Sequence, residues 1–284
     1  MSAPSVRQRR LGAELRALRE AAGLKLDDVA RQVGHGYDGP RLSRVERAQL
    51  RVKPEVVAAL LDVYSVTEPG KRDVLVALAR AGSQRGWWQT YQDVISPSYA
   101  ELISLESDAQ SLRSYQTQLI PGLLQRVEYA RATIAGINPT LTAEEVDALA
   151  QVRLARQSVL TRPTPLEVWA IVHEAALHPE LPPRVMRAQL GHLLEQMELS
   201  NVSIQIMPLT ASPHPGMSGP FTVLRFPESA DLDVVLVEHL VSALYVEDAA
   251  DVSVCNSAFE HLRAHALPLD KSADLTARIM KDLK

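Results

Sequence analysis

The chain contains a single cysteine, Cys255, among its 284 residues, and only 5% of its residues are aromatic. One cysteine cannot form an intramolecular disulfide or a cysteine-based zinc site, which fits a reducing compartment. No apolar run approaches the roughly 20 residues that a membrane helix needs. The first ten residues are polar and arginine-rich, unlike a secretory signal. We expect a cytoplasmic protein with no membrane contact, no cofactor and no metal.

The composition, 46% hydrophobic and 23% charged, is that of an ordinary globular protein, and the length suggests about two domains of roughly 100–200 residues. The net charge of −4 is unevenly distributed. Residues 1–85 hold 16 Lys and Arg against 10 Asp and Glu, whereas the remaining residues hold 14 against 24. A local charge of +6 before one of −10 suggests that the first part meets a polyanion.

Five short helices are predicted in the first 81 residues from apolar residues at helical spacing. The predicted helices end at Gly23, run from Leu26 to Gly34, begin at Pro40, run from Pro54 to Tyr64, and run from Lys71 to Ala81. Two helices, a turn and an arginine-bearing third helix are the layout of a helix-turn-helix.

The third helix is predicted to have two chemically different faces. Leu42, Val45 and Glu46 fall on one side at 100° per residue, and Arg44 falls opposite, flanked by Arg41 and Arg47. Arginine binds guanine bidentately and pairs well with phosphate, so this face suits a DNA groove. The alternative is a solvated basic surface helix.

Three stretches carry a resemblance to a known family: LRALREAAGLKLDDVARQVG (15–34), LSRVERA (42–48) and KPEVVAALLDVYSV (53–66). Over about residues 7–67 they resemble the Xre-type, phage-repressor-like helix-turn-helix family. The resemblance implies double-stranded DNA as the ligand. It also implies a pair between an arginine late in the first helix and a glutamate of the recognition helix, here Arg19 and Glu46.

Relatives often carry Thr-Gln where this chain has Lys25 and Leu26, and the turn before the third helix is long and glycine-rich. We predict Arg44 and then Arg41 as base-reading residues. The predicted DNA-binding set is Lys25, Tyr37, Arg41, Ser43, Arg44, Arg47, Arg51 and Lys53, of which Lys25, Arg51 and Lys53 are phosphate contacts.

The remainder of the chain is predicted to be α+β with a largely antiparallel sheet, within a protein that is mainly α. A helical stretch is expected from Tyr99 to Leu160, interrupted at Pro121 and Asn138. Strands are expected at 166–172, 202–207, 221–226, 234–238 and 244–246, and helices at 184–199, 249–266 and 273–283.

This part also carries a resemblance, in RGWW (85–88), ESDAQSLRSYQTQLIPGLLQRVEYARA (106–132), RLARQ (153–157) and GPFTVLRFP (219–227). It resembles the C-terminal domain of an actinobacterial group in which an Xre-type head is fused to an uncharacterised or antitoxin-like domain. The resemblance implies a transcriptional regulator that binds a small acidic protein encoded nearby.

Aromatic residues gather at the start of this part. A partner or ligand surface is predicted from Trp87, Trp88, Tyr91, Tyr115 and Tyr129. The alternative is that they fill the core. A homodimer is expected because Xre-type heads read paired half-sites.

Catalysis is not expected. His173 and Glu174 follow a predicted strand, and His261 and His265 share a helix face, but neither pair has the further groups that a catalytic or zinc site needs.

The predicted domains are a helix-turn-helix domain at 1–70, a helical linker at 71–95 and a sensing and oligomerisation domain at 96–284. We predict a sequence-specific DNA-binding regulator modulated by a small acidic partner protein or a ligand. The alternative is an antitoxin that neutralises a neighbouring small protein and regulates its own operon.

Overall fold

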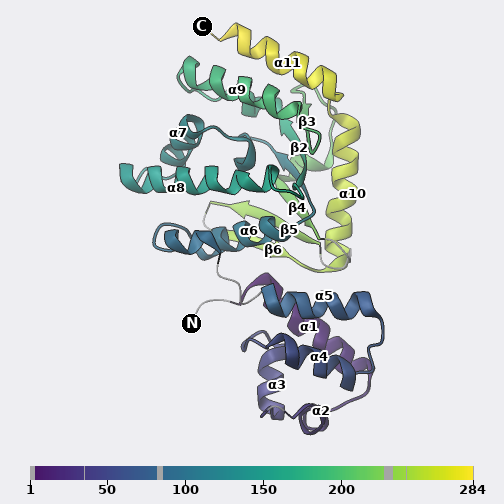
Figure 1. Cartoon of the computed structure of the whole chain (residues 1–284). Helices are drawn as coiled ribbons and strands as arrows, with labels where there is room; N and C mark the ends of the chain where they lie inside the picture. The colour runs from purple at the N-terminus through teal and green to yellow at the C-terminus, as the bar shows by residue number, and fades with distance from the viewer. Residues whose placement is uncertain (1–3, 35, 82–85, 227–232, 241, 284) are drawn as a thin grey trace. The chain divides into compact units, whose positions relative to one another are not determined.

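The computed structural model describes residues 4–34, 36–81, 86–226, 233–240 and 242–283 (Figure 1). These residues separate into two compact units, one up to Trp87 and the other from Trp88 onward. Residues 82–85 of the predicted linker and Pro227 of the GPFTVLRFP stretch lie outside the described residues. None of the described helices is long and apolar enough to cross a membrane.

The first unit confirms the five predicted helices. They are α1 (Val6–Ala21), α2 (Leu26–Val33), α3 (Gly39–Glu46), α4 (Pro54–Val63) and α5 (Pro69–Ala81). Gly23 and Gly34 follow α1 and α2 with φ of +68° and +64°, a conformation that glycine adopts without steric cost. Asp38 caps α3 by accepting a hydrogen bond from the Arg41 backbone N–H at 2.7 Å.

All five helices contribute side chains to one apolar core. Leu15 of α1, Val29 of α2 and Leu42 of α3 meet the buried aliphatic side chains of α4 there. Leu75 and Ala79 of α5 belong to the same core. Residues 71–81, which the sequence analysis placed in a linker, therefore pack as part of the first unit.

Helices α1 and α3 approach each other most closely at Gly12. A Cβ atom at this position would lie 2.6 Å from the backbone oxygen of Glu46 and 2.8 Å from that of Val45. These are backbone atoms of α3, which cannot move aside as a side chain does. A residue without a side chain is therefore needed where the two helices cross.

A nearly buried ion pair also joins α1 to α3. Arg19 donates from Nε to Glu46 Oε1 at 2.6 Å and from Nη2 to Oε2 at 2.9 Å, and from Nη1 to the backbone oxygen of Leu24 at 3.0 Å. The Arg19 and Glu46 side chains are 12% and 7% exposed. The hydrogen bond to Glu46 outweighs burial and raises the pKa of Arg19, so the pair stays charged.

The second unit joins six α-helices and six strands among its described residues. The helices are α6 (Pro97–Asp108), α7 (Val127–Ile137), α8 (Ala143–Arg156), α9 (Pro183–Met197), α10 (Ala249–His265) and α11 (Leu269–Asp282). The strands are β1 (Ser111–Gln116), β2 (Glu167–His173), β3 (Val202–Met207), β4 (Phe221–Arg225), β5 (Val234–His239) and β6 (Ser242–Val246).

The sheet has the order β3-β2-β1-β4-β5-β6 and is mixed. Strands β1, β2 and β3 pair in parallel, whereas β4, β5 and β6 continue antiparallel from β1. The prediction of a largely antiparallel sheet was therefore wrong. Helices α7 and α8 lie between β1 and β2 in the chain, and α9 lies between β2 and β3. Such helical crossovers return the chain to the same edge and make neighbouring strands parallel.

Strand β1 was missed, because the sequence analysis assigned residues 99–160 to helices. Its sequence, SLRSYQ, contains only two apolar residues, Leu112 and Tyr115. Ser114 is nonetheless buried, and its hydroxyl lies 3.2 Å from that of Thr222 on β4. β1 is a strand because β2 and β4 pair with both of its edges, which no local pattern records.

Helices cover both faces of the sheet (Figure 1). Helix α10 covers one face, where Phe259 and Leu262 pack with Tyr115 and Ile171. Helices α6, α7 and α8 lie on the other side in Figure 1. Of these, α6 and α8 are joined by a buried ion pair in which Arg156 donates to both carboxylate oxygens of Glu106 at 2.9 and 2.6 Å.

A glycine substitution tests the close approach of α1 and α3. We expect Gly12→Ala to destabilise the first unit by about 1–3 kcal/mol, because the new methyl group overlaps the α3 backbone. Gly70→Ala is the matched control, since open space surrounds Gly70 and alanine favours the helix by up to about 1 kcal/mol. Hydrogen exchange in α1 and α4 measures both opening free energies, and equal values would contradict the close approach.

A pair of arginine substitutions tests the α1–α3 ion pair. We expect Arg19→Gln to cost about 3 kcal/mol in the opening free energy of α3, because it leaves the Glu46 carboxylate nearly buried and unpaired. Arg16→Gln is the control, since its pair with Glu20 is 59% and 52% exposed and contributes less than about 1 kcal/mol. Hydrogen exchange of α3 amides reports both, and a similar loss in the two variants would refute this account.

Candidate nucleic-acid interface

Helix α3 presents one buried and one exposed face. Leu42 and Val45 are 2% and 3% exposed and pack in the core of the first unit. Arg44 and Arg47 are exposed on the other side of the helix. Arg44 has no hydrogen-bond or ion-pair partner among the described residues, so its guanidinium is available to a ligand. Arg47 donates from Nε to the Ser43 backbone oxygen at 3.2 Å.

Arg41 and Tyr37 form one structural unit in front of α3. The Arg41 guanidinium carbon lies 4.4 Å from the Tyr37 ring centroid, and Nη1 donates to the backbone oxygen of Gly36 at 3.1 Å. Stacking on an aromatic ring and a hydrogen bond hold this guanidinium in one orientation. The predicted base-reading residue Arg41 is thus preorganised, whereas Arg44 is free.

The start of α3 lies close to α2. A Cβ atom at Gly39 would lie 2.1 Å from Oδ1 of Asp27 in the first turn of α2. The two helices are therefore packed tightly at the turn, and Asp38, the N-cap of α3, continues this arrangement. Sequence reasoning left the role of this turn open, although an aspartate directly before Gly-Pro is a recognisable N-cap signal.

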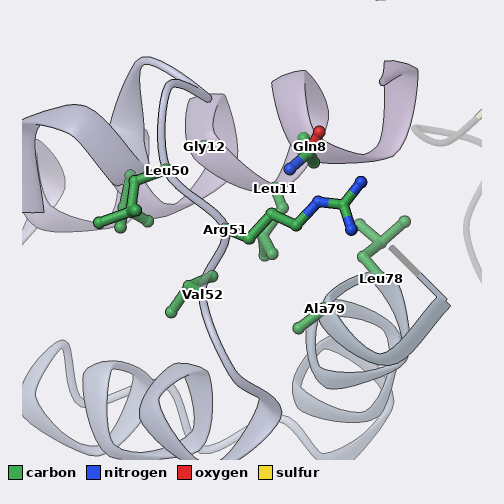
Figure 2. Close-up of a pocket in the computed structure, with 9 residues that line it drawn as sticks. Gln8, Leu11, Gly12, Leu50, Arg51, Val52, Leu78 and Ala79 are labelled. Atoms are coloured by element: carbon green, nitrogen blue, oxygen red, sulfur yellow. The ribbon is translucent and has the colours of Figure 1, made fainter. Parts of the chain in front are cut away.

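The predicted phosphate contacts lie at the edges of these helices. Lys25 and Lys53 are exposed and occupy the N-cap positions of α2 and α4, and neither side chain caps its helix. Arg51 lies beside a cavity of about 40 Å³ lined by α1, the segment before α4 and α5, and its guanidinium points toward Gln8 and Leu78 (Figure 2). This cavity has room for a few waters only and is not a ligand site.

The five predicted partner or ligand aromatics do not form one surface. Tyr115 and Tyr129 are 1% and 0% exposed, and burial raises the pKa of both hydroxyls. Trp88 and Tyr91 pack instead against a cluster that contains Ile95, Ile103 and Val152. Trp87 is 38% exposed. The core interpretation therefore holds for Tyr115 and Tyr129, which are closed to a partner.

The histidines considered for catalysis have local structural contacts. His173 accepts at Nδ1 from the Ala175 N–H at 3.2 Å, and Glu174 accepts from the Leu209 N–H at 3.0 Å. His265 Nδ1 lies 2.8 Å from the backbone oxygen of His261. In the described part of the chain no three His, Cys, Asp or Glu residues are arranged to hold a metal. The absence of catalysis stays a prediction.

Comparison with known families agrees with the two units. A model described as a helix-turn-helix domain matches residues 10–75, and a model described as a domain of unknown function, DUF5753, matches residues 99–278. Neither a curated protein nor a solved structure matches the chain. The helix-turn-helix match supports a DNA-binding transcription regulator. Because the second model covers more than half of the chain, the protein belongs to the DUF5753 family and carries a helix-turn-helix domain before that domain.

Proposed function

We propose that this protein is a sequence-specific transcriptional regulator that inserts α3 into the major groove of DNA. The observation that carries the proposal is the pair of faces on α3. Leu42 and Val45 are buried, while Arg44 and Arg47 are exposed on the opposite side. A helix held by its apolar back presents its front to base edges, as in other helix-turn-helix domains.

The roles within the interface follow from how each cation is held. Arg44 is free to place its planar fork against guanine O6 and N7, the commonest specific contact in the major groove. Arg41, stacked on Tyr37, presents a fixed guanidinium to a base or a phosphate. Lys25 and Lys53 are assigned to phosphates, which position the domain without reading sequence.

The second unit is the signal-binding part in this proposal. Binding of a signal shifts the protein toward or away from its DNA-competent state by as much as the signal's affinity for the two states differs. The homodimer, the small acidic partner protein, the Xre-type and actinobacterial assignments and the antitoxin alternative stay predictions of the sequence.

The test begins with a DNA site selected from a random pool by the full chain. We expect Arg44→Ala to lose about 1–3 kcal/mol of discrimination between this site and a scrambled duplex, because one bidentate base contact disappears. Fluorescence anisotropy of both duplexes across a salt series measures the discrimination. Equal affinity of the unmodified protein for both duplexes at every salt concentration would overturn the proposal.

Lys53→Ala is the matched control for charge. Its loss removes a phosphate contact, so we expect it to weaken both duplexes by the same factor and to reduce the salt slope by about 1. A selective loss of the specific site in Lys53→Ala would reassign base reading to this lysine.

A further inference from the structure

A large cavity lies in the second unit, away from every residue assigned to DNA. Its volume is about 470 Å³, within the range of roughly 300–1,000 Å³ that small-molecule sites occupy. It is lined by α6, α7, α8 and the β5 and β6 strands, together with residues just before α6. None of the proteins or families compared with the chain assigns a ligand to this cavity.

The sheet supplies the floor of the cavity. The β5–β6 register pairs Leu236 with Tyr245 and Glu238 with Ala243, and all four residues line the cavity. Side chains alternate between the faces of a strand, so these four share one face. Val237 lies on the other face with the α10 residue Val252. The cavity therefore lies on the face of the sheet that α10 does not cover.

Aliphatic side chains make the walls. Leu102 of α6, Ile134 of α7, Leu149 of α8 and Leu141 before α8 all line the cavity. The Tyr245 hydroxyl donates to the backbone oxygen of Ser98 at 2.7 Å, which ties β6 to the start of α6. An apolar body fits these walls, because its burial removes hydrocarbon surface from water.

One cation lines the cavity without a carboxylate to balance it. Arg153 donates from Nη1 to Gln125 Oε1 at 2.9 Å, and among the described residues no acidic side chain pairs with it. Its Nε is buried and has no hydrogen-bond partner in the described part of the chain. Three residues along α8, Arg156 is fully paired with Glu106. A buried unpaired donor is costly, so Arg153 is set to receive an anion.

A second polar group lines the same cavity. The Tyr99 hydroxyl accepts a hydrogen bond from Arg156 Nη1 at 2.7 Å and keeps its own proton to donate. A carboxylate oxygen accepts such a proton and the N–H groups of Arg153. Glu238 also lines the cavity, but it is exposed, so solvent screens its repulsion.

We propose that this cavity binds a small amphipathic acid, with an aliphatic body against the walls and one carboxylate on Arg153. The inference deepens the proposed function, since it names the chemical class of the signal, and it rests on that function only for its regulatory meaning. The binding itself involves the second unit alone.

Calorimetric titration of the full chain with decanoate, without DNA, tests the site. We expect one saturable site per chain, weakened at least tenfold by Arg153→Gln. The neutral analogue 1-decanol is expected to bind the unmodified protein and Arg153→Gln equally, because it cannot use the charge. Arg153→Lys keeps the charge and is expected to restore part of the decanoate affinity.

Two further variants separate the cavity from the rest of the unit. Ala243→Trp fills the cavity from its floor and is expected to abolish binding of both compounds. Arg187→Gln removes an exposed arginine of α9 that does not line the cavity, and is expected to change neither. Near-ultraviolet circular dichroism checks that each variant keeps its fold, and decanol binding by Arg153→Gln shows that its cavity is intact.

The inference is overturned if the unmodified protein shows no saturable decanoate binding, if Arg153→Gln binds decanoate as well as the unmodified protein does, or if Ala243→Trp retains binding. Because no DNA is present, these outcomes leave the proposed DNA-binding function standing. Failure of the DNA experiment likewise leaves the ligand site standing.

Discussion

The way α1 holds α3 is the constraint on which the DNA-binding surface depends. A helix as short as α3, with eight residues, is not stable by itself in water, so its direction comes from its neighbours. Gly12 lets the α3 backbone approach, and the Arg19–Glu46 pair keeps the two helices at one angle. Where Arg44 points is a consequence of these contacts, because its own side chain has no partner to orient it.

Helix α8 shows how the same residue type serves two purposes in the second unit. Arg156 is buried, and its charge is met by both oxygens of Glu106. Burial by itself lowers the pKa of Arg156, but the charge of Glu106 and the contacts with Tyr99 raise it above its ordinary value. Arg153 has no such carboxylate and lines a cavity. A paired arginine stabilises the fold, whereas an unpaired one selects an anion.

Most of the secondary structure was predictable, because it depends on local patterns. The periodicity of apolar residues and the positions of Gly23, Gly34, Pro40 and Pro54 placed the five helices of the first unit. The β-rich stretches placed β2 to β6. Strand β1 was missed because its burial comes from two neighbours distant in the chain. The strand directions were also wrong, although α9 between β2 and β3 was itself a signal for a parallel crossover.

By itself the sequence determined the basic helix-turn-helix, its arginine-bearing face and the partners Arg19 and Glu46, since these follow from spacing and residue type. Only the tertiary structure decided which cations are free, that Tyr115 and Tyr129 are closed to a partner, and that a cavity lies beside Arg153. The physical reason is that burial and pairing depend on contacts between segments far apart in the chain. A sequence records residue types at each position, but pairing depends on which segments meet in the folded protein.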